Sequence, residues 1–292
     1  GRARAPARGR GCASGPIARL PRPCPDPSTA FAADVSKEHR RRCVRRRPPV
    51  SGIIAARMTA ARVFEEGLLV PYSPSPAWSG TLLVLAPHPD DEVFGCGGAC
   101  ALAAAAGARV VPVLLTSGEA GVDEGGAAPG EVARRRLAES ERAATRLGTE
   151  GPRALGFADR SLAGRGEDLV AAIAALVVEL KPDVVLAPSP AEIHPDHRAA
   201  ARAAHLAFLR AWPKAPERLV FYEVSAPLSP NRLIDVGPVA DRKAAAVAAF
   251  ASQLDRLPYD ELTDGLARYR AMTLPGGVTR AEAFLELTRD EV

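Results

Sequence analysis

The chain has 292 residues, of which 47% are hydrophobic and 25% charged, which is enough apolar material for one large α/β domain or two small ones. No run approaches 18 uninterrupted apolar residues, so the sequence predicts no membrane span. The net charge of +4 averages two unlike parts, because residues 1–57 hold 14 Lys+Arg against three acids, and residues 58–292 hold 24 against 31. The acidic body gives no reason to expect a nucleic-acid partner.

Residues 1–57 are rich in Arg, Pro, Gly and Ala and show no hydrophobic periodicity. The first methionine is Met58, and the composition changes at that point. We therefore expect a disordered basic head over residues 1–57 and one folded domain over residues 58–292. The head lacks the apolar segment of a secretory signal. Two alternatives stay open, namely an Arg-rich transit peptide and a segment that is absent from the native protein.

Cysteine usage points to a reducing compartment. Three of the five cysteines lie in the basic head, and the body has only Cys96 and Cys100, which are spaced for one face of a helix. This pattern is typical of buried thiols and not of a disulfide scaffold, so we expect a cytoplasmic protein.

Regular hydrophobic patterning begins after Met58, with strands that alternate with helices. Short apolar runs predict strands, and longer amphipathic or Ala-rich runs predict helices. The predicted elements are a strand at 81–87, a helix at 98–106, a strand at 109–116, helices at 131–147 and 167–180, a strand at 183–188, a helix at 198–212 and a strand at 219–224. Pro112 suggests an edge or a bulge in its strand.

This alternation predicts a Rossmann-like three-layer α/β fold, with a mostly parallel sheet and helices on both faces. In such folds, ligands collect at the carboxyl ends of the strands. The two most unusual segments follow predicted strands: His-Pro-Asp-Asp-Glu at residues 88–92, and Glu-Ile-His-Pro-Asp-His at residues 192–197.

These residue types suit a catalytic metal ion, which needs three protein ligands and one open position. His88 and Asp91 lie on one tight turn and can bind the ion from one side, while His197 binds it from the other turn. Asp90 is then left beside the open position as a general base. His194 can stabilise the developing oxyanion and protonate the leaving amine. Spacing alone leaves zinc, manganese and iron open.

Each motif also has a simpler interpretation, because acidic residues are common caps at helix N-termini. Taken singly, each is more typical of a cap than of a site, but both follow strands of one alternating pattern, and together they favour a metal site. Gly95, Gly97 and Gly98 do not fit the G-x-G-x-x-G spacing, and we expect them to let a helix start close to the first motif. Glu192 is expected to face the substrate.

The sequence A-P-H-P-D-D-E, followed by F-G-C-G-G and by the later H-P-D-H, resembles the two signature motifs of the LmbE-like family. This family is also called the PIG-L or N-acetylglucosaminyl-phosphatidylinositol de-N-acetylase family. The similarity includes T-S-G-E-A-G, an R-x-x-E-x-x-x-A-x-x-x-L-G pattern that starts at Arg136, and an L-G-F-x-D segment that ends at Asp159. It covers residues 80–287, so the basic head lies outside it.

The resemblance implies that His88, Asp91 and His197 bind zinc, one ion per chain. It implies that Asp90 is the general base and that His194 assists as acid or electrophile.

The resemblance also assigns two further residues. It implies that Asp159 orients and charge-tunes His194, and that Arg136 reaches a hydroxyl or phosphate of the substrate. For Arg136, which lies in the run 134–136, a solvated helix face is the competing interpretation.

The predicted function is that of a zinc-dependent hydrolase that removes an N-acetyl group from an N-acetylglucosamine-type amino sugar or a related small amide. Two alternatives stay open, an amidase of a larger thiol-sugar conjugate and a non-catalytic sugar-binding protein on the same fold. The expected partner is a small-molecule amino sugar, and a homo-oligomer stays open. We expect the loops at residues 121–130 and 258–265 to set specificity, although nothing in them names a ligand.

Overall fold

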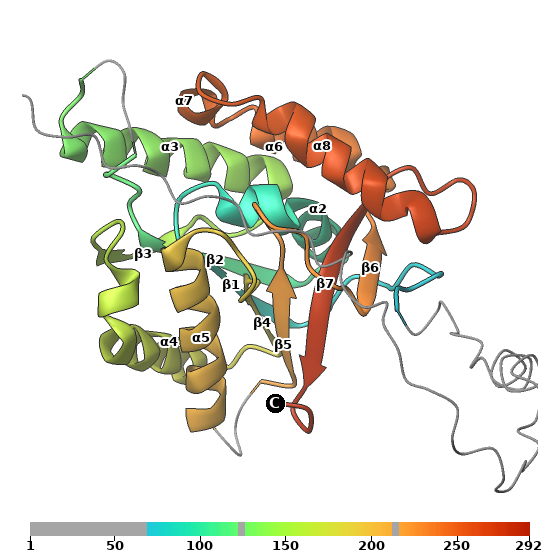
Figure 1. Ribbon diagram of the computed structural model, residues 1–292, viewed down its shortest axis with the longest axis horizontal. Helices are drawn as coiled ribbons and strands as arrows, with labels where there is room; N and C mark the ends of the chain where they lie inside the picture. Colours follow the sequence, from blue (N-terminus) through green and yellow to red (C-terminus); the bar gives the residue numbers. More distant parts are fainter. Residues whose placement is uncertain (1–68, 122–125, 212–215) are drawn as a thin grey trace, which may run out of the picture. The chain divides into compact units, whose positions relative to one another are not determined.

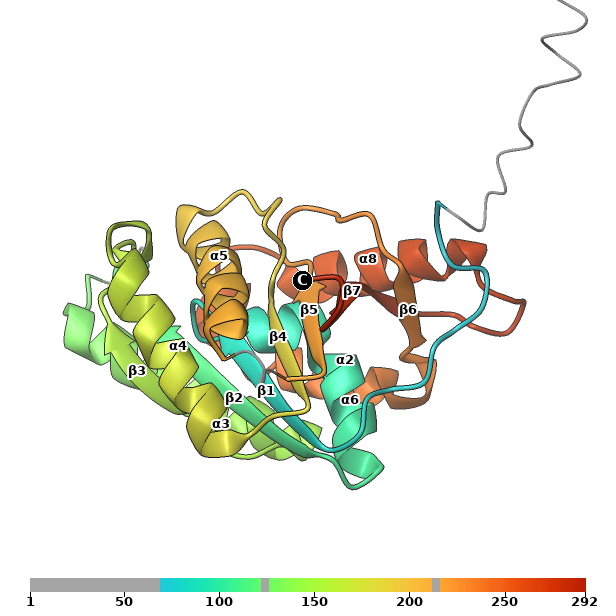
Figure 2. The same cartoon turned by 90° about the horizontal axis from the view of Figure 1, so that it is seen from below.

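A seven-stranded sheet runs through the described part of this computed structural model, which comprises residues 69–121, 126–211 and 216–292 (Figure 1). The strands are β1 (Thr81–Ala86), β2 (Arg109–Thr116), β3 (Arg153–Phe157), β4 (Val184–Pro188), β5 (Arg218–Tyr222), β6 (Arg232–Asp235) and β7 (Ala281–Thr288). Their order is β3-β2-β1-β4-β5-β7-β6, so that β3 and β6 lie at opposite ends of the sheet (Figure 2). The first five are parallel, and β7 pairs antiparallel with both β5 and β6.

Helices cover both faces of the sheet. They are α2 (Asp91–Ala105), α3 (Pro129–Leu147), α4 (Gly166–Leu180), α5 (Pro195–Arg210), α6 (Ala240–Val247), α7 (Ala251–Leu254) and α8 (Tyr259–Arg270), with 3-10 turns η2 (Leu162–Gly164), η3 (Gly237–Val239) and η4 (Ala271–Thr273). Figure 1 shows α3, α6, α7 and α8 gathered on one side of the molecule and α4 beside α5 away from them.

The two faces of β1 explain these layers, because successive side chains of a strand point to opposite faces. Leu83 and Leu85 pack with α4 and α5 in one core cluster, whereas Leu82 and Val84 pack with α2 in another. A third cluster joins α2 to α3 and α6. The arrangement confirms the predicted Rossmann-like three-layer fold.

The predicted strands at 81–87, 109–116, 183–188 and 219–224 are all present, with ends that differ by no more than two residues. One detail was wrong, because the first helix begins at Asp91 and not at residue 98. Of the edge or bulge suggested for the strand with Pro112, the edge is absent because β2 is an interior strand, but the pairing of β2 with β3 has a register shift between Leu114 and Thr116. The missing N–H of Pro112 is tolerated because β3 begins to pair with β2 only at Val113.

The predicted head at residues 1–57 and its boundary at Met58 lie outside the described residues. The described residues belong to one unit, Val63–Val292. Within them, no helix combines the length and apolar content that crossing a bilayer requires.

The backbone N–H groups that follow a kink in α2 are hydrogen-bonded by a residue near the carboxyl-terminal end of the chain. Cys96 leaves helical geometry, with φ −141° and ψ 16°, which deprives the next turn of backbone partners. The Glu282 carboxylate, on β7, accepts hydrogen bonds of 2.8 Å from the N–H groups of Gly98 and Ala99. Lys243 Nζ on α6 donates to the same carboxylate at 2.6 Å. The first helix is thereby fixed to the last strand.

The glycines of α2 differ in the space around them. A Cβ at Gly95 would lie 2.7 Å from the backbone oxygen of Glu223 and closer still to the ring of the fully buried Tyr222. A Cβ at Gly97 would meet nothing nearer than 3.5 Å. The close approach of α2 to the end of β5 therefore requires a glycine at position 95.

We expect Gly95→Ala to lower the free energy of unfolding by about 2 kcal/mol, because the added methyl group overpacks a buried interface. Gly97→Ala serves as the matched control and should be neutral or stabilising by about 0.5 kcal/mol, since alanine has the higher helix propensity. Urea unfolding followed by circular dichroism measures both. Equal effects of the two substitutions would contradict this account of the packing.

Candidate metal centre

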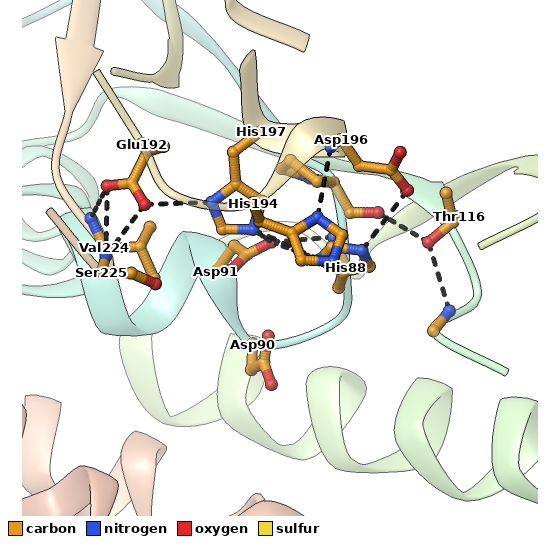
Figure 3. A network of polar contacts seen from close by, with 12 residues as sticks. His88, Asp90, Asp91, Thr116, Glu192, His194, Asp196, His197, Val224 and Ser225 are labelled. Atoms are coloured by element: carbon orange, nitrogen blue, oxygen red, sulfur yellow. Dashed lines mark hydrogen bonds and ion pairs between the residues drawn. The ribbon is translucent and has the colours of Figure 1, made fainter. Parts of the chain in front are cut away.

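The two predicted motifs meet because β1 and β4 are neighbouring parallel strands. The direction in which successive strands are added to the sheet reverses at β1, because β2 lies on one side of it and β4 on the other. Such switch points are where open α/β sheets bind ligands. His88 follows the end of β1, His194 is the N-cap of α5, and His197 lies in the first turn of that helix (Figure 3).

Three side-chain atoms form a nearly equilateral triangle. Asp91 Oδ2 lies 3.2 Å from His88 Nδ1 and 3.2 Å from His197 Nε2, and the two nitrogens are 3.3 Å apart. A tetrahedral ion with ligands at about 2.0–2.1 Å holds its ligand atoms about 3.3 Å apart. Two imidazole nitrogens and one carboxylate oxygen thus have the spacing of three ligands on one face of such an ion.

The trio is buried, with exposed fractions of 8% for His88, 4% for Asp91 and 3% for His197. Burial raises the pKa of Asp91, but the two imidazoles outweigh it and hold that pKa well below its usual range. Burial likewise works against protonation of His197, yet Asp91 and Glu192 raise its pKa to about 9. The site therefore keeps a carboxylate ionised and concentrates negative charge around its imidazoles.

Each imidazole of the trio contacts a further carboxylate through its other ring nitrogen. His88 Nε2 lies 3.1 Å from Asp159 Oδ1 and 3.7 Å from Asp196 Oδ2, and His197 Nδ1 lies 3.4 Å from Glu192 Oε2. Metal-binding histidines are commonly oriented by such an outer carboxylate, which also selects the tautomer. Nδ1 of His88 and Nε2 of His197 are thus left to face each other and Asp91.

The expected partner of Asp159 was wrong. Its carboxylate lies against His88 and not against His194, because Asp159 follows β3 and its Oδ2 accepts a hydrogen bond from the Ala120 N–H, beyond the end of β2. His194 finds a different partner, since its Nδ1 accepts a hydrogen bond of 3.2 Å from the Asp196 N–H.

Asp90 lies beside the trio, toward α3 (Figure 3). Its backbone has φ 136°, a region that non-glycine residues rarely adopt, and its own N–H donates to Glu92 Oε2 at 3.1 Å. Burial raises the pKa of Asp90 and Arg136 lowers it, with a result of about 6. A carboxylate next to the three-atom face can thus exchange a proton near neutral pH.

The burial of Arg136 contradicts one of its two predicted roles, and its contact with a substrate stays a prediction. It is only 5% exposed, so it is not on a solvated helix face. Its Nη2 donates to Asp90 Oδ2 at 2.7 Å and to the Pro89 oxygen at 2.8 Å, and its Nη1 donates to the Gly118 oxygen at 3.2 Å. α3 thus holds the strained Asp90 in place through Arg136.

His194 is half-buried and lies edge-on to His88, with ring centroids 4.8 Å apart. Nitrogens of His88, His194 and His197 lie within 4.8 Å of one another, so an all-histidine set is a looser alternative to the trio. Because His194 Nδ1 accepts the Asp196 N–H, the neutral ring carries its proton on Nε2. Burial, followed by the nearby His88 and His197, lowers the pKa of His194.

Two residues of the second motif do more than the sequence indicated. Glu192 is 1% exposed and does not face outward, because its carboxylate accepts the backbone N–H groups of Val224 and Ser225 and contacts His197. Asp196 is fully buried, lies near His88 and bonds the Leu162 N–H. Its position inside His-Pro-Asp-His was the only signal in the sequence for that role.

Comparison with known proteins identifies the family of the chain. Residues 83–208 match the family model of PIG-L, described as GlcNAc-PI de-N-acetylase. Diacetylchitobiose deacetylase of Thermococcus kodakarensis is 33% identical over 189 residues, which covers 59% of this chain and 69% of that protein. The probable N-acetyl-alpha-D-glucosaminyl L-malate deacetylase 2 of Bacillus cereus is 31% identical over 191 residues, 61% of this chain and 86% of that protein.

Among solved structures, the conserved protein TT1542 of Thermus thermophilus superposes with a TM-score of 0.62 at 36% identity, covering 70% of this chain and 93% of that chain. Sequence and structure therefore agree on one relationship, and the chain belongs to the PIG-L family, also called LmbE-like.

Proposed function

We propose that this protein is a metal-dependent hydrolase that removes the N-acetyl group from an N-acetylglucosamine-type amino sugar. The observation that carries the proposal is the trio of His88, Asp91 and His197 at 3.2–3.3 Å, with the Asp90 carboxylate beside it and outside it. A binding site needs only the trio, whereas hydrolysis also needs a base. The relatives named deacetylases act on N-acetylglucosamine-type sugars, which supports the same substrate class here.

We propose zinc as the ion, because two imidazoles and one carboxylate in a buried tetrahedral arrangement are a common zinc ligand set. When bound, a zinc ion polarises an amide carbonyl and lowers the pKa of water. His88, Asp91 and His197 would hold it, and Asp159, Asp196 and Glu192 would orient the two histidines.

Asp90 is proposed as the general base. With a pKa of about 6, it is ionised at neutral pH and still basic enough to take the proton of the attacking water. Arg136 keeps it ionised despite its burial and fixes the direction of its Oδ2. The strained backbone at Asp90 fits this role, because strain is retained where the position of a functional group matters.

His194 is proposed to act on the other side of the scissile amide. Its Nδ1 is occupied by the Asp196 N–H, so Nε2 carries the proton that can be donated to the developing oxyanion or to the leaving amine. Because Asp159 contacts His88, its proposed role is to orient a metal ligand and not His194. The products are acetate and a free amine, and no covalent acyl-enzyme is required.

Further proposals concern the setting of the enzyme. We propose that the deacetylase domain spans residues 58–292 and acts in the cytoplasm, which the unpaired Cys96 and Cys100 support. An amidase of a larger conjugate would use the same side chains and is distinguished by its products. The decisive assay loads the purified protein with zinc and measures acetate release from a panel of N-acetylglucosaminyl compounds.

The first prediction separates metal binding from proton transfer. We expect His88→Ala and His197→Ala to lose bound metal and activity together. Asp90→Asn should retain metal and lose at least about 100-fold in kcat, because it removes only the base. Metal content by plasma mass spectrometry, measured beside kcat, tests this. Full activity of the Asp90 variant would eliminate the proposed base.

The second prediction tests which histidine Asp159 serves. Asp159→Asn should weaken zinc affinity by about tenfold or more, because His88 loses an outer carboxylate. A chelator competition titration measures the affinity. If kcat falls while zinc affinity is unchanged, Asp159 acts through His194 and the structural assignment is wrong.

The third prediction concerns pH. A general base must be deprotonated to act, and Arg136 lowers the pKa of Asp90, so Arg136→Gln should raise that pKa above about 6. The acid limb of the kcat/KM profile should therefore move to higher pH by about one unit or more. Arg134→Gln on the same helix, where the side chain is 78% exposed, is the control and should leave the limb in place. The limb position does not depend on the amount of folded enzyme.

A further inference from the structure

A second guanidinium group, that of Arg256, lies near Arg136 but has no counter-ion among the described residues. Arg256 lies between α7 and α8, its side chain is exposed, and among the described residues it makes no ion pair or side-chain hydrogen bond. Arg136, in contrast, is neutralised by Asp90 at 2.7 Å. Within the ranges that the structure describes, Arg136 is thus a compensated cation and Arg256 an uncompensated one.

The two guanidinium groups share one small space beside Gly121. A Cβ placed on Gly121 would lie 3.7 Å from Arg136 Nη1 and 3.8 Å from Arg256 Nη1. Arg136 links this space to the proposed base, because its Nη2 also donates to Asp90. Asp90 compensates the charge of Arg136, so Arg256 is the cation there whose charge an anionic ligand would compensate.

The segment that carries Arg256 is attached to the same helix as Arg136. Glu139 lies one turn beyond Arg136 on α3, is 2% exposed, and accepts hydrogen bonds from Ser252 N–H at 3.0 Å and Ser252 Oγ at 2.6 Å. α7 is therefore fixed to α3 just before Arg256. This gives the R-x-x-E pattern of the sequence a structural meaning, since one residue holds the base and the other holds the Arg256 segment.

Tyr259 places the start of α8 close to the site as well. Its ring stacks on Phe94 of α2, with centroids 4.9 Å apart and an interplanar angle of 24°. Burial raises the pKa of the Tyr259 hydroxyl, the Asp90 carboxylate raises it further, and Arg256 opposes this. Phe94 lies in the first turn of α2, shortly after Asp90 and Asp91. The stacked ring therefore places the start of α8, and Arg256 just before it, close to the candidate site.

From this geometry we infer that Arg256 is a specificity-determining residue that binds an acidic group, a carboxylate or a phosphate, on the part of the substrate away from its acetamido group. The inference rests on the proposed deacetylase function. A guanidinium is suited to this task because its planar donors match the paired oxygens of both groups. Ile193, next to His194, is 70% exposed and apolar, so it offers no charge for the same purpose.

The test compares three substrates that carry the same N-acetylglucosaminyl unit and differ in the attached group, which is neutral, a carboxylate or a phosphate. For wild type we expect a higher kcat/KM with at least one acidic substrate than with the neutral one, and a preference that weakens as salt rises. Arg256→Gln should lower the ratio of acidic to neutral kcat/KM about tenfold, mainly through KM. The carboxylate and phosphate arms identify which anion is recognised.

Two further variants complete the test. Arg256→Lys keeps the charge without the planar donors and should retain part of the preference, and Arg202→Gln removes an exposed cation on α5 and should retain all of it. An unchanged ratio in Arg256→Gln, or no acidic preference in wild type, overturns the inference while leaving the deacetylase function intact. If wild type releases no acetate from any of the three substrates, the deacetylase function fails, and the inference fails with it.

Discussion

One carboxylate oxygen, Asp91 Oδ2, holds the candidate site together, because it lies at 3.2 Å from imidazoles that come from segments more than one hundred residues apart. That meeting is possible only because β1 and β4 are adjacent and both end at the same edge of the sheet. The oxygen is itself oriented by the backbone N–H of His88 at 2.9 Å. The sheet order therefore sets the position of the trio, and the tight turn after β1 sets the direction of Asp91 Oδ2.

The Asp90 carboxylate is held by a second layer of the molecule. α3 lies behind α2 and reaches the first motif through Arg136, which compensates the charge of the buried Asp90 and occupies the backbone oxygen of Pro89. The trio of His88, Asp91 and His197 is thus fixed by the sheet, whereas Asp90 is fixed by a helix that packs on another helix. A displacement of α3 would alter the basicity and direction of Asp90 without moving His88 or Asp91.

The sequence predicted the features that depend on local patterns. The four predicted strands were found because apolar runs of five to eight residues are local signals. The trio was predicted because two motifs followed strands of one alternating pattern. The partners of Asp159 and Arg136 were not predictable in this way. The first depends on where β3 ends beside β2, and the second on which of three consecutive arginines turns inward.

The same limit explains why the carboxyl-terminal strand went unrecognised. β7 runs antiparallel between β5 and β6, and nothing in a single stretch of sequence specifies a neighbour about sixty residues away. The acidic residue at its start was equally uninformative, because a lone glutamate is normally solvated. Only the folded chain shows that Glu282 bonds the amides beyond the kink of α2.

That link between α2 and β7 has a consequence for the order of events during synthesis. Asp91 is synthesised about 190 residues before Glu282. A nascent chain emerging from the ribosome therefore carries the turn with His88 and Asp91 long before the kinked helix α2 can bond the Glu282 carboxylate. The amides of Gly98 and Ala99 cannot bond the Glu282 carboxylate before then. Completion of the site is thus a late, long-range event, and an incomplete chain carries exposed histidines and acids ahead of the scaffold that organises them.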